Sequence, residues 1–311
     1  MNQLQQTTSN ILMIRPSNFG FNEETAANNS FQSKDQSLTS DEVKKKAMEE
    51  FDNFVAKMRG EGINVIVMDD TAEPIKPDAV FPNNWVTFHQ DGVVITYPMY
   101  SEIRRNERRE DVLEKLKEHY KVEGTIRLEK FEAESRFLEG TGSMILDRVN
   151  KICYACTSPR TEEGLLDIFC ELGHYQKAAF QSVDGNGEDI YHTNVMMALG
   201  EDFVVIGMDT VKDEAQKKML LEMFAKTNKA VIDISFEQIL SFAGNMLQVR
   251  NEKGETYLVM SQQAFESLTD KQIREIEMRT KILYSPIETI ETLGGGSARC
   301  MMAEVFLPKK N

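Results

Sequence analysis

Residues 144–182 read MILDRVNKICYACTSPRTEEGLLDIFCELGHYQKAAFQS, and their pattern predicts the repeating unit of the fold. Two short apolar runs, at 144–148 and 151–157, are typical of strands. The stretch from about 161 to 173 has helical periodicity and ends in glycine, and a third strand is expected at 175–182. The predicted unit is therefore strand, strand, helix, strand.

The same order is written four times in full along the chain, and a fifth copy can be assembled across the chain ends. That copy combines the last predicted strand (298–308) with the N-terminal strand (11–16), a helix (41–60) and the strand 64–69. A unit of about 50–60 residues repeated around an axis indicates a closed α/β ring, in which the first and last strands meet. A conventional two-layer α/β domain is the alternative that the pattern leaves open.

The sequence also predicts a long loop and several further helices and strands. Residues 17–40, rich in Asn, Ser, Thr and Gln, are expected to form one long loop and a candidate lid over the site. The periodicity predicts one charged helix at about 103–120 and one helix at about 262–279. Strands are expected at 84–89 and 194–199.

Composition excludes several kinds of partner. The 311 residues include 36 basic and 50 acidic side chains, a net charge of −14. Because Lys and Arg largely drive binding to phosphate backbones, this balance argues against a nucleic-acid partner and an anionic membrane surface. No apolar run of about 18 residues predicts a membrane span, and the start MNQLQQTTSN lacks a signal pattern, so a cytoplasmic protein is expected. Four cysteines in such a chain do not indicate a disulfide scaffold.

Cys300 is the candidate nucleophile, at the end of LGGGSARC (293–300). The glycines before it allow unusual backbone torsions, which can expose a thiol where a loop enters a strand. A buried structural cysteine is the alternative. To act as a nucleophile at neutral pH, the thiol needs a partner, usually a histidine.

His192 is the best of the four histidines for that role, because it lies in a Gly-rich loop that enters a strand. A surface loop histidine is the alternative reading. Glu139, in the Gly-punctuated loop FLEGTGSMILD (137–147), is a candidate for the carboxylate that orients His192. Many other acids satisfy that last requirement equally well.

Two other motifs do not indicate a site. CYAC (153–156) lies within a predicted strand, where alternation directs its two cysteines to opposite faces, and no second ligand pair follows to complete a zinc site. The three glycines at 294–296 lack the Lys-Ser/Thr step and the helix that follows a phosphate-binding loop.

Together, several stretches resemble the arginine deiminase and amidinotransferase superfamily, the pentein fold. They occur in order as PDAVFPNNW (77–85), RRNE (104–107), LEGTGSM (138–144), SPRT (158–161), YHTN (191–194) and GGGSARC (294–300). The resemblance implies a single catalytic domain over residues 1–311, folded as a five-bladed α/β propeller of strand–strand–helix–strand units with pseudo-fivefold symmetry. It also implies Cys300 as nucleophile, His192 as acid and base, and Glu139 as the group that holds His192.

Within that superfamily, residues 11–32 and the FPNNW stretch look most like the citrulline-hydrolysing subgroup. Members that accept arginine usually place carboxylates where this sequence has Asn84 and Asn194. A guanidinium is a permanent cation with only donors, whereas a ureido group is neutral and has an acceptor oxygen that an amide can match. The two asparagines therefore favour citrulline, although Asp78 and Glu139 keep a cationic substrate open, and loop-holding asparagines are the alternative.

The resemblance also implies substrate contacts at Asp78 and Asn83, with Arg105 and Arg160 as candidates for gripping the substrate carboxylate. It implies no metal and no organic cofactor, since a thiolate and a proton shuttle suffice. The expected partner is a small ureido or guanidino amino acid, and a homodimer stays open. The alternatives are a guanidino-group hydrolase or amidinotransferase, of the arginine deiminase or dimethylarginine hydrolase type, and a non-catalytic binding protein of the same fold.

Overall fold

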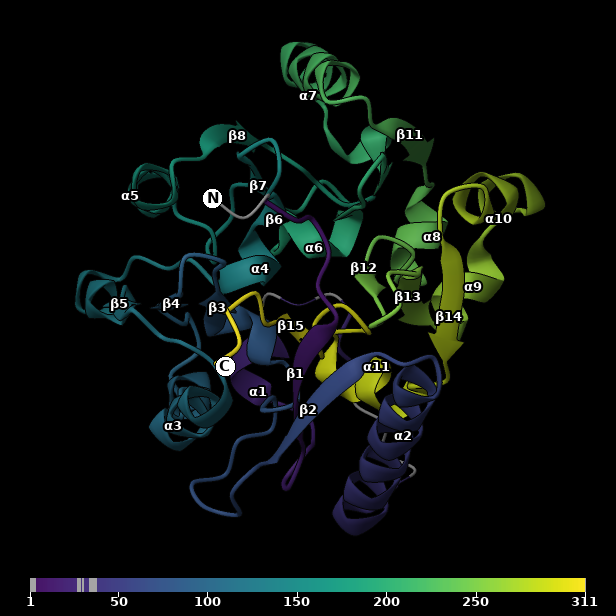
Figure 1. Cartoon of the computed structure of the whole chain (residues 1–311). Coiled ribbons are helices and arrows are strands. Elements are labelled where there is room, and N and C mark those ends of the chain that lie inside the picture. Colours follow the sequence, from purple (N-terminus) through teal and green to yellow (C-terminus); the bar gives the residue numbers. More distant parts are fainter. Residues whose placement is uncertain (1–3, 27–28, 30, 34–37, 311) are drawn as a thin grey trace.

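The chain builds five three-stranded sheets around a common centre (Figure 1). The computed structural model describes residues 4–26, 29, 31–33 and 38–310. Within each sheet the strands run from an inner one to a middle one to an outer one. In that order the sheets are β15 (Ala303–Glu304), β1 (Asn10–Arg15) and β2 (Asn64–Asp69); β3 (Val86–Phe88), β4 (Val93–Thr96) and β5 (Gly124–Arg127); β6 (Ile145–Asp147), β7 (Ile152–Cys156) and β8 (Gln176–Phe180); β9 (Met197–Leu199), β10 (Phe203–Ile206) and β11 (Ala230–Asp233); and β12 (Leu247–Arg250), β13 (Thr256–Ser261) and β14 (Lys281–Ser285).

All five sheets share one topology. The inner strand pairs antiparallel with the middle strand, and the middle strand pairs parallel with the outer one. A parallel pair needs a crossover, which a helix provides in each sheet. These crossover helices are α2 (Ser40–Gly60), α3 (Glu110–His119), α5 (Glu163–Gly173) and α7 (Glu214–Lys226), and the pair α9 (Gln262–Ser267) and α10 (Asp270–Glu277). The order predicted for residues 144–182 is thus confirmed, and the five sheets fit the expected pseudo-fivefold arrangement.

The two ends of the chain meet, as the fifth copy required. β1 pairs antiparallel with β15, with Ile11 opposite Glu304, and parallel with β2, with Ile11 opposite Val65. The strand predicted at 298–308 is wrong in extent, because β15 has only two residues. The residues before it form tight turns, in which the Cys300 amide donates to the Ser297 carbonyl at 3.0 Å, and α11 (Glu288–Gly294) precedes them.

Other connections also differ from the sequence expectations. The helix predicted at 262–279 is broken, because Thr269 begins α10 with a capping box. The charged helix predicted at 103–120 divides into the 3₁₀ turn η2 (Ile103–Glu107) and α3. Short helical turns replace the first residues of two predicted strands: η1 (Pro82–Asn84) before β3 and α6 (Thr193–Met196) before β9. Shorter elements complete the described chain: α1 (Glu23–Ala26), η3 (Glu129–Glu134), α4 (Gly140–Ser143), η4 (Met208–Thr210) and α8 (Phe236–Leu240).

The loop predicted at 17–40 is only partly correct, since it contains α1, and residues 27–28, 30 and 34–37 lie outside the described part. The helix that follows is fixed at its start by a capping box between Thr39 and Glu42. It buries one face, including Phe51 and Phe54, against the first sheet. Full burial of such a side chain stabilises a fold by roughly 1.5–3 kcal/mol.

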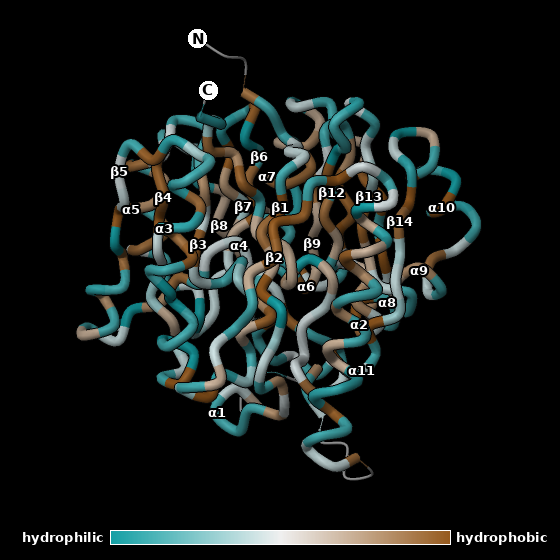
Figure 2. Tube along the Cα trace, turned by 60° about the horizontal axis from the view of Figure 1, so that its bottom comes forward, coloured by the Kyte–Doolittle hydropathy of each residue, from teal (hydrophilic) through white to brown (hydrophobic). Residues whose placement is uncertain are grey.

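Hydrophobic residues follow the strands, whereas the loops and outer helices are mostly hydrophilic (Figure 2). The two cysteines of CYAC contribute to different apolar clusters, Cys153 to one and Cys156 to another, as strand alternation predicted. Among the described helices, none is both long and apolar enough to cross a bilayer. The same residues contain no cluster of His, Cys, Asp or Glu side chains that could hold a metal ion.

Candidate active site

The site is assembled from the turns that precede the five inner strands. Each sheet supplies one such turn, so residues far apart in sequence converge at the centre (Figure 1). In chain order the polar side chains that these turns bring together are Asn84 before β3, Glu139 before β6, His192 and Asn194 before β9, Asn245 before β12 and Cys300 before β15. All six are buried.

His192 and Glu139 form a close pair. Nε2 of His192 lies 2.7 Å from Oε2 of Glu139, and the second carboxylate oxygen accepts the backbone N–H of Tyr100 at 2.9 Å. Burial raises the pKa of Glu139, but the combined effect of Arg160 and His192 is larger and lowers the pKa to about 2. Nη1 of Arg160 lies 3.8 Å from Oε2 of Glu139. Glu139 is therefore ionised at neutral pH and can only accept hydrogen bonds.

His192 is neutral in the same range of pH. Burial lowers its pKa to about 4, and the opposing effect of Glu139 is smaller. Since the ionised Glu139 can only accept, Nε2 of His192 carries the proton and Nδ1 is left with a lone pair. A neutral imidazole with a free ring nitrogen can take a proton from a reacting group and return it.

Two asparagine amides hold the sulfur of Cys300. Nδ2 of Asn194 and Nδ2 of Asn245 each lie 3.3 Å from Sγ. Asn245 was not among the residues predicted from the sequence. Its signal is positional, since AGNML at 243–247 enters an inner strand in the same way as SARCMM at 297–302. The loop before Cys300 is itself anchored, because the Ser297 hydroxyl donates to the buried Glu291 at 2.6 Å.

Two glycines make the close approach of these groups feasible. Gly295 has a φ of +62°, a left-handed conformation that ends α11 and that glycine adopts without strain. At Gly142, a Cβ would lie 2.4 Å from Nδ2 of Asn84 and 2.8 Å from Nδ1 of His192. Any larger residue at Gly142 would therefore displace both side chains.

Asp78 and Asn84 line the same small cavity as Cys300 and His192. Asn84 is 2% exposed, and among the described residues its Nδ2 has no hydrogen-bond partner. Asp78 accepts from Nδ2 of Asn22 at 2.7 Å through one oxygen, whereas its other oxygen has no hydrogen-bond partner in the described chain. Burial raises the pKa of Asp78, and Arg104 opposes that effect. A ligand bound in this cavity would satisfy these buried polar atoms.

Asn83 is also fully buried, but it does not line that cavity. Its backbone carbonyl accepts the Thr141 hydroxyl at 3.3 Å, and Gly140 packs directly against it, so that a Cβ on Gly140 would lie 2.3 Å away. The geometry thus places Asn83 behind the site, next to the turn that carries Glu139.

Of the two arginines predicted to grip a carboxylate, only Arg160 lines the cavity. It stacks on the ring of Tyr191 and is 2% exposed. Arg105 lies outside, where it donates to the Met99 carbonyl at 3.2 Å and faces Glu102 and Glu132. Its neighbour Arg104, on the same 3₁₀ turn η2, is buried and lines the cavity instead.

Arg104 is buried and paired with Glu107 through two bonds of 2.8 and 2.9 Å. Its Nε lies 3.7 Å from Asp78. This fixed guanidinium and that of Arg160 give the cavity two cationic groups, next to the carboxylates of Asp78 and Glu139.

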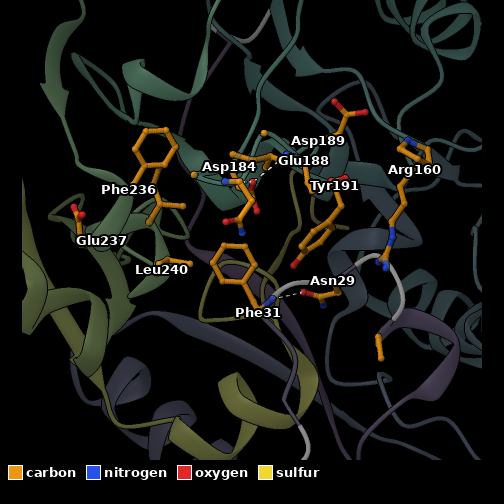
Figure 3. Close-up of a pocket in the computed structure, with 17 residues that line it drawn as sticks. Asn29, Phe31, Arg160, Asp184, Glu188, Asp189, Tyr191, Phe236, Glu237 and Leu240 are labelled. Carbon is orange, nitrogen blue, oxygen red and sulfur yellow. Dashed lines mark hydrogen bonds between the residues drawn. The ribbon is translucent and has the colours of Figure 1, made fainter.

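The described part of the segment 17–40 reaches the cavity, as the lid expectation requires. Thr25 and Asn29 line it, and Nδ2 of Asn29 donates to the Gly295 carbonyl at 3.3 Å. An adjoining cavity of about 780 Å³ shares Asn29, Arg160 and Tyr191 with it. Figure 3 shows Tyr191 between Phe31 and Arg160 among the residues that line this larger space.

Comparison with known proteins gives the family. A family model described as N,N dimethylarginine dimethylhydrolase, eukaryotic, matches residues 15–307. No curated protein matches the sequence. The site and the five-sheet fold define a member of the arginine deiminase and amidinotransferase superfamily, the pentein fold. Within it, the chain belongs to the N,N dimethylarginine dimethylhydrolase family.

Solved structures support the fold. ArgZ, an arginine dihydrolase from the ornithine–ammonia cycle in cyanobacteria, is 15% identical with a TM-score of 0.74, and the match covers 96% of this chain but only 41% of ArgZ. The substrate-bound N-terminal domain of ArgZ is 16% identical, with a TM-score of 0.74 and coverage of 96% of this chain and 98% of that domain.

A dimethylarginine dimethylaminohydrolase bound to S-methyl-L-thiocitrulline is 15% identical, with a TM-score of 0.66 and coverage of 96% of this chain and 99% of that one. These relatives are hydrolases that act on carbon–nitrogen bonds, so the expectation of an enzyme of this class is confirmed.

Proposed function

We propose that the protein hydrolyses the ureido group of citrulline to ornithine, ammonia and carbon dioxide through a covalent intermediate on Cys300. The observation that carries this proposal is the amide of Asn84. Its buried Nδ2 has no hydrogen-bond partner among the described residues, in the cavity that holds Cys300.

A buried donor without an acceptor costs free energy, about 1–3 kcal/mol for a polar group. The ureido oxygen of citrulline is an acceptor and would satisfy that donor. A guanidinium offers five donors and no acceptor, so it would leave Nδ2 of Asn84 facing further N–H groups. The amide of Asn194 adds to this preference, because its buried Oδ1 likewise has no partner in the described chain and can accept one ureido N–H.

The proposed chemistry uses the groups already described. The thiolate of Cys300 attacks the ureido carbon, and His192 moves the proton to the departing nitrogen and then activates water. Glu139 holds the imidazole in the tautomer that has its lone pair on Nδ1. Citrulline and one water give ornithine, ammonia and carbon dioxide, whichever nitrogen departs first.

Arg160 and Arg104 are the proposed anchors for the α-carboxylate. Both guanidinium groups line the cavity, and Arg is suited to a carboxylate because its planar donors match the two oxygens. Each is fixed before the substrate arrives, Arg104 by Glu107 and Arg160 by stacking on Tyr191, so little side-chain entropy is lost on binding.

A guanidino-group hydrolase is the second candidate, and two observations favour it. The relatives named above are arginine and dimethylarginine enzymes. In addition, one oxygen of the buried Asp78 has no hydrogen-bond partner in the described chain and could pair with a cationic head group. The comparisons support this candidate better than they support citrulline, whereas the amides of Asn84 and Asn194 support citrulline.

Product analysis separates these functions. The purified protein is incubated separately with citrulline, arginine and dimethylarginine, and ornithine, citrulline and ammonia are measured. Ornithine from citrulline supports the proposal, whereas citrulline from arginine or dimethylarginine supports the second candidate. Binding without any product would indicate a non-catalytic binding protein. The Cys300→Ala variant serves as the control for turnover at this site.

A further inference from the structure

Asn245 lies between Cys300, the proposed nucleophile, and Asn194, a proposed substrate contact. Its Nδ2 lies 3.3 Å from Sγ of Cys300 and 2.9 Å from the backbone carbonyl of Asn194. Its Oδ1 accepts the backbone N–H of Arg299 at 3.0 Å. The side chain is 1% exposed, so these bonds are made away from bulk water.

From this geometry we propose that Asn245 is a catalytic residue, which acts with Asn194 to form a two-donor site for the thiolate of Cys300. The inference rests on the proposed function only in taking Cys300 as the nucleophile. It does not depend on which ureido or guanidino compound is the substrate.

Two N–H donors directed at one sulfur favour its ionised form. A thiolate is a full anion and accepts hydrogen bonds that are charge-assisted, whereas a neutral thiol is a weak acceptor. The amides therefore stabilise the thiolate more than the thiol. The thiol proton passes to the free Nδ1 of His192, which later gives it to the departing nitrogen, and the sulfur keeps the electron pair that attacks the substrate carbon.

The orientation of Asn245 is fixed by its surroundings. A Cβ on the preceding Gly244 would lie 2.3 Å from the backbone carbonyl of Val195, so the two turns that carry Asn245 and Asn194 are packed backbone to backbone. The bond from the Arg299 amide fixes which end of the Asn245 amide faces Sγ. The donor is thus in place before any substrate binds, which avoids a reorganisation cost during the reaction.

Charged and titratable groups from the neighbouring turns line the cavity of Cys300, interact with its sulfur or contact the groups that line the cavity. They are Asp78 before η1, Arg104 on η2, Glu139 before α4, Arg160 after β7, Tyr191 and His192 before α6, and Arg299 in its own turn. Two pairs of opposite charge occur among these groups, Arg104 with Asp78 and Arg160 with Glu139. The two amides add local stabilisation that needs no cation from the substrate, and this suits a neutral ureido compound.

Alkylation by iodoacetamide, a neutral reagent, tests the proposal without any substrate. The rate at Cys300 is followed by intact-protein mass between pH 5 and 10, with Cys300→Ala as background. Asn245→Asp replaces the donor and keeps the acceptor for Arg299, and Asn245→Ala removes the amide without adding charge. Asn251→Asp is the matched control, since Asn251 is a buried asparagine that bonds Glu61 and Glu255 instead.

We expect both Asn245 variants to move the pH midpoint of alkylation upward by about one to two units, which lowers the rate near pH 7 by roughly tenfold to a hundredfold. Asn251→Asp should keep the wild-type midpoint even if it lowers stability. An unchanged midpoint in both Asn245 variants, or an equal shift in Asn251→Asp, would overturn the proposal. If Asn245→Asp does not fold, Asn245→Ala decides; if Asn245→Ala does not fold, an unchanged midpoint in Asn245→Asp still overturns the proposal, since both the lost donor and the added charge should raise it. Failure of citrulline turnover would leave this result intact.

Discussion

His192 and Glu139 come from neighbouring sheets and meet at 2.7 Å through Nε2 and Oε2. Because the carboxylate is ionised and accepts a hydrogen bond from the Nε2–H of the imidazole, the contact fixes both the orientation and the tautomer of His192. The same carboxylate is tied to the backbone N–H of Tyr100, so a rigid chain of bonds supports the proposed acid and base.

Glu139→Gln should lower kcat by about 10²–10⁴-fold while the protein stays folded, because an amide can present an N–H to Nε2 and favour the wrong tautomer. Glu162→Gln is the control, since that carboxylate caps α5 at the backbone N–H groups of Gly164 and Leu165. Steady-state kinetics with the substrate that is turned over provide the measurement. Equal activity of wild type and Glu139→Gln would contradict the role given to this pair.

The buried neutral His192 should make stability depend on pH. Its pKa is about 4 in the folded protein and rises to the ordinary value near 6.5 on unfolding. Between these values the unfolded chain binds a proton that the folded chain does not, so stability falls as pH falls from 6.5 to 4. The contribution is about 3 kcal/mol at most. Urea unfolding of wild type and His192→Gln at several pH values measures it, and identical slopes would count against it.

Gly142→Ala should disable the site without unfolding the protein. The added Cβ would clash with Asn84 and His192 together, so we expect kcat/KM to drop at least 100-fold, by analogy with the cost of small misplacements of catalytic groups. Gly60→Ala, where nothing lies within 4 Å of an added Cβ, is the control. Normal kinetics in Gly142→Ala would show that the turn tolerates a side chain and that the packing argument is wrong.

Arg104 and Arg105 allow a test at adjacent positions. Arg104→Ala should raise KM by about 10-fold or more, because it removes a proposed carboxylate anchor, whereas Arg105→Ala should change KM by less than about 2-fold. Loss of the Arg104–Glu107 pair also leaves a buried carboxyl unpaired, so thermal stability is measured in parallel. If Arg105→Ala raised KM more than Arg104→Ala, the result would support Arg105, as predicted from the sequence, as the residue that grips the substrate carboxylate.

The repeating order of elements could be predicted from the sequence pattern, because each repeat carries its own periodicity and turn residues, whereas the five-bladed ring and the roles of Asn84 and Asn194 came from the resemblance to the pentein superfamily. The meeting of β1 with β15 follows from counting units, and Cys300, His192, Glu139, Asn84 and Asn194 lie in turns that such a ring brings to its centre. Local sequence could not decide which of two adjacent arginines points inward, since that depends on the 3₁₀ turn that carries them.

Asn245 was missed for a different reason. It has no histidine, cysteine or glycine run beside it, and asparagines before strands are common in loops. Its significance appears only from the fold, because the turn before β12 leads into an inner strand, as do the turns that carry Cys300 before β15 and Asn84 before β3. Pseudo-symmetry, applied turn by turn, is the sequence signal that would have identified it.

The most direct test of the account is the ratio of kcat/KM for citrulline to kcat/KM for arginine, measured by release of ammonia together with ornithine from citrulline and citrulline from arginine, with the same preparation near neutral pH. If the amides of Asn84 and Asn194 select an uncharged head group, citrulline should be preferred by at least 100-fold, since unpaired buried polar groups penalise the wrong substrate strongly. Turnover of arginine with none of citrulline would contradict the proposed function and establish a guanidino-group hydrolase.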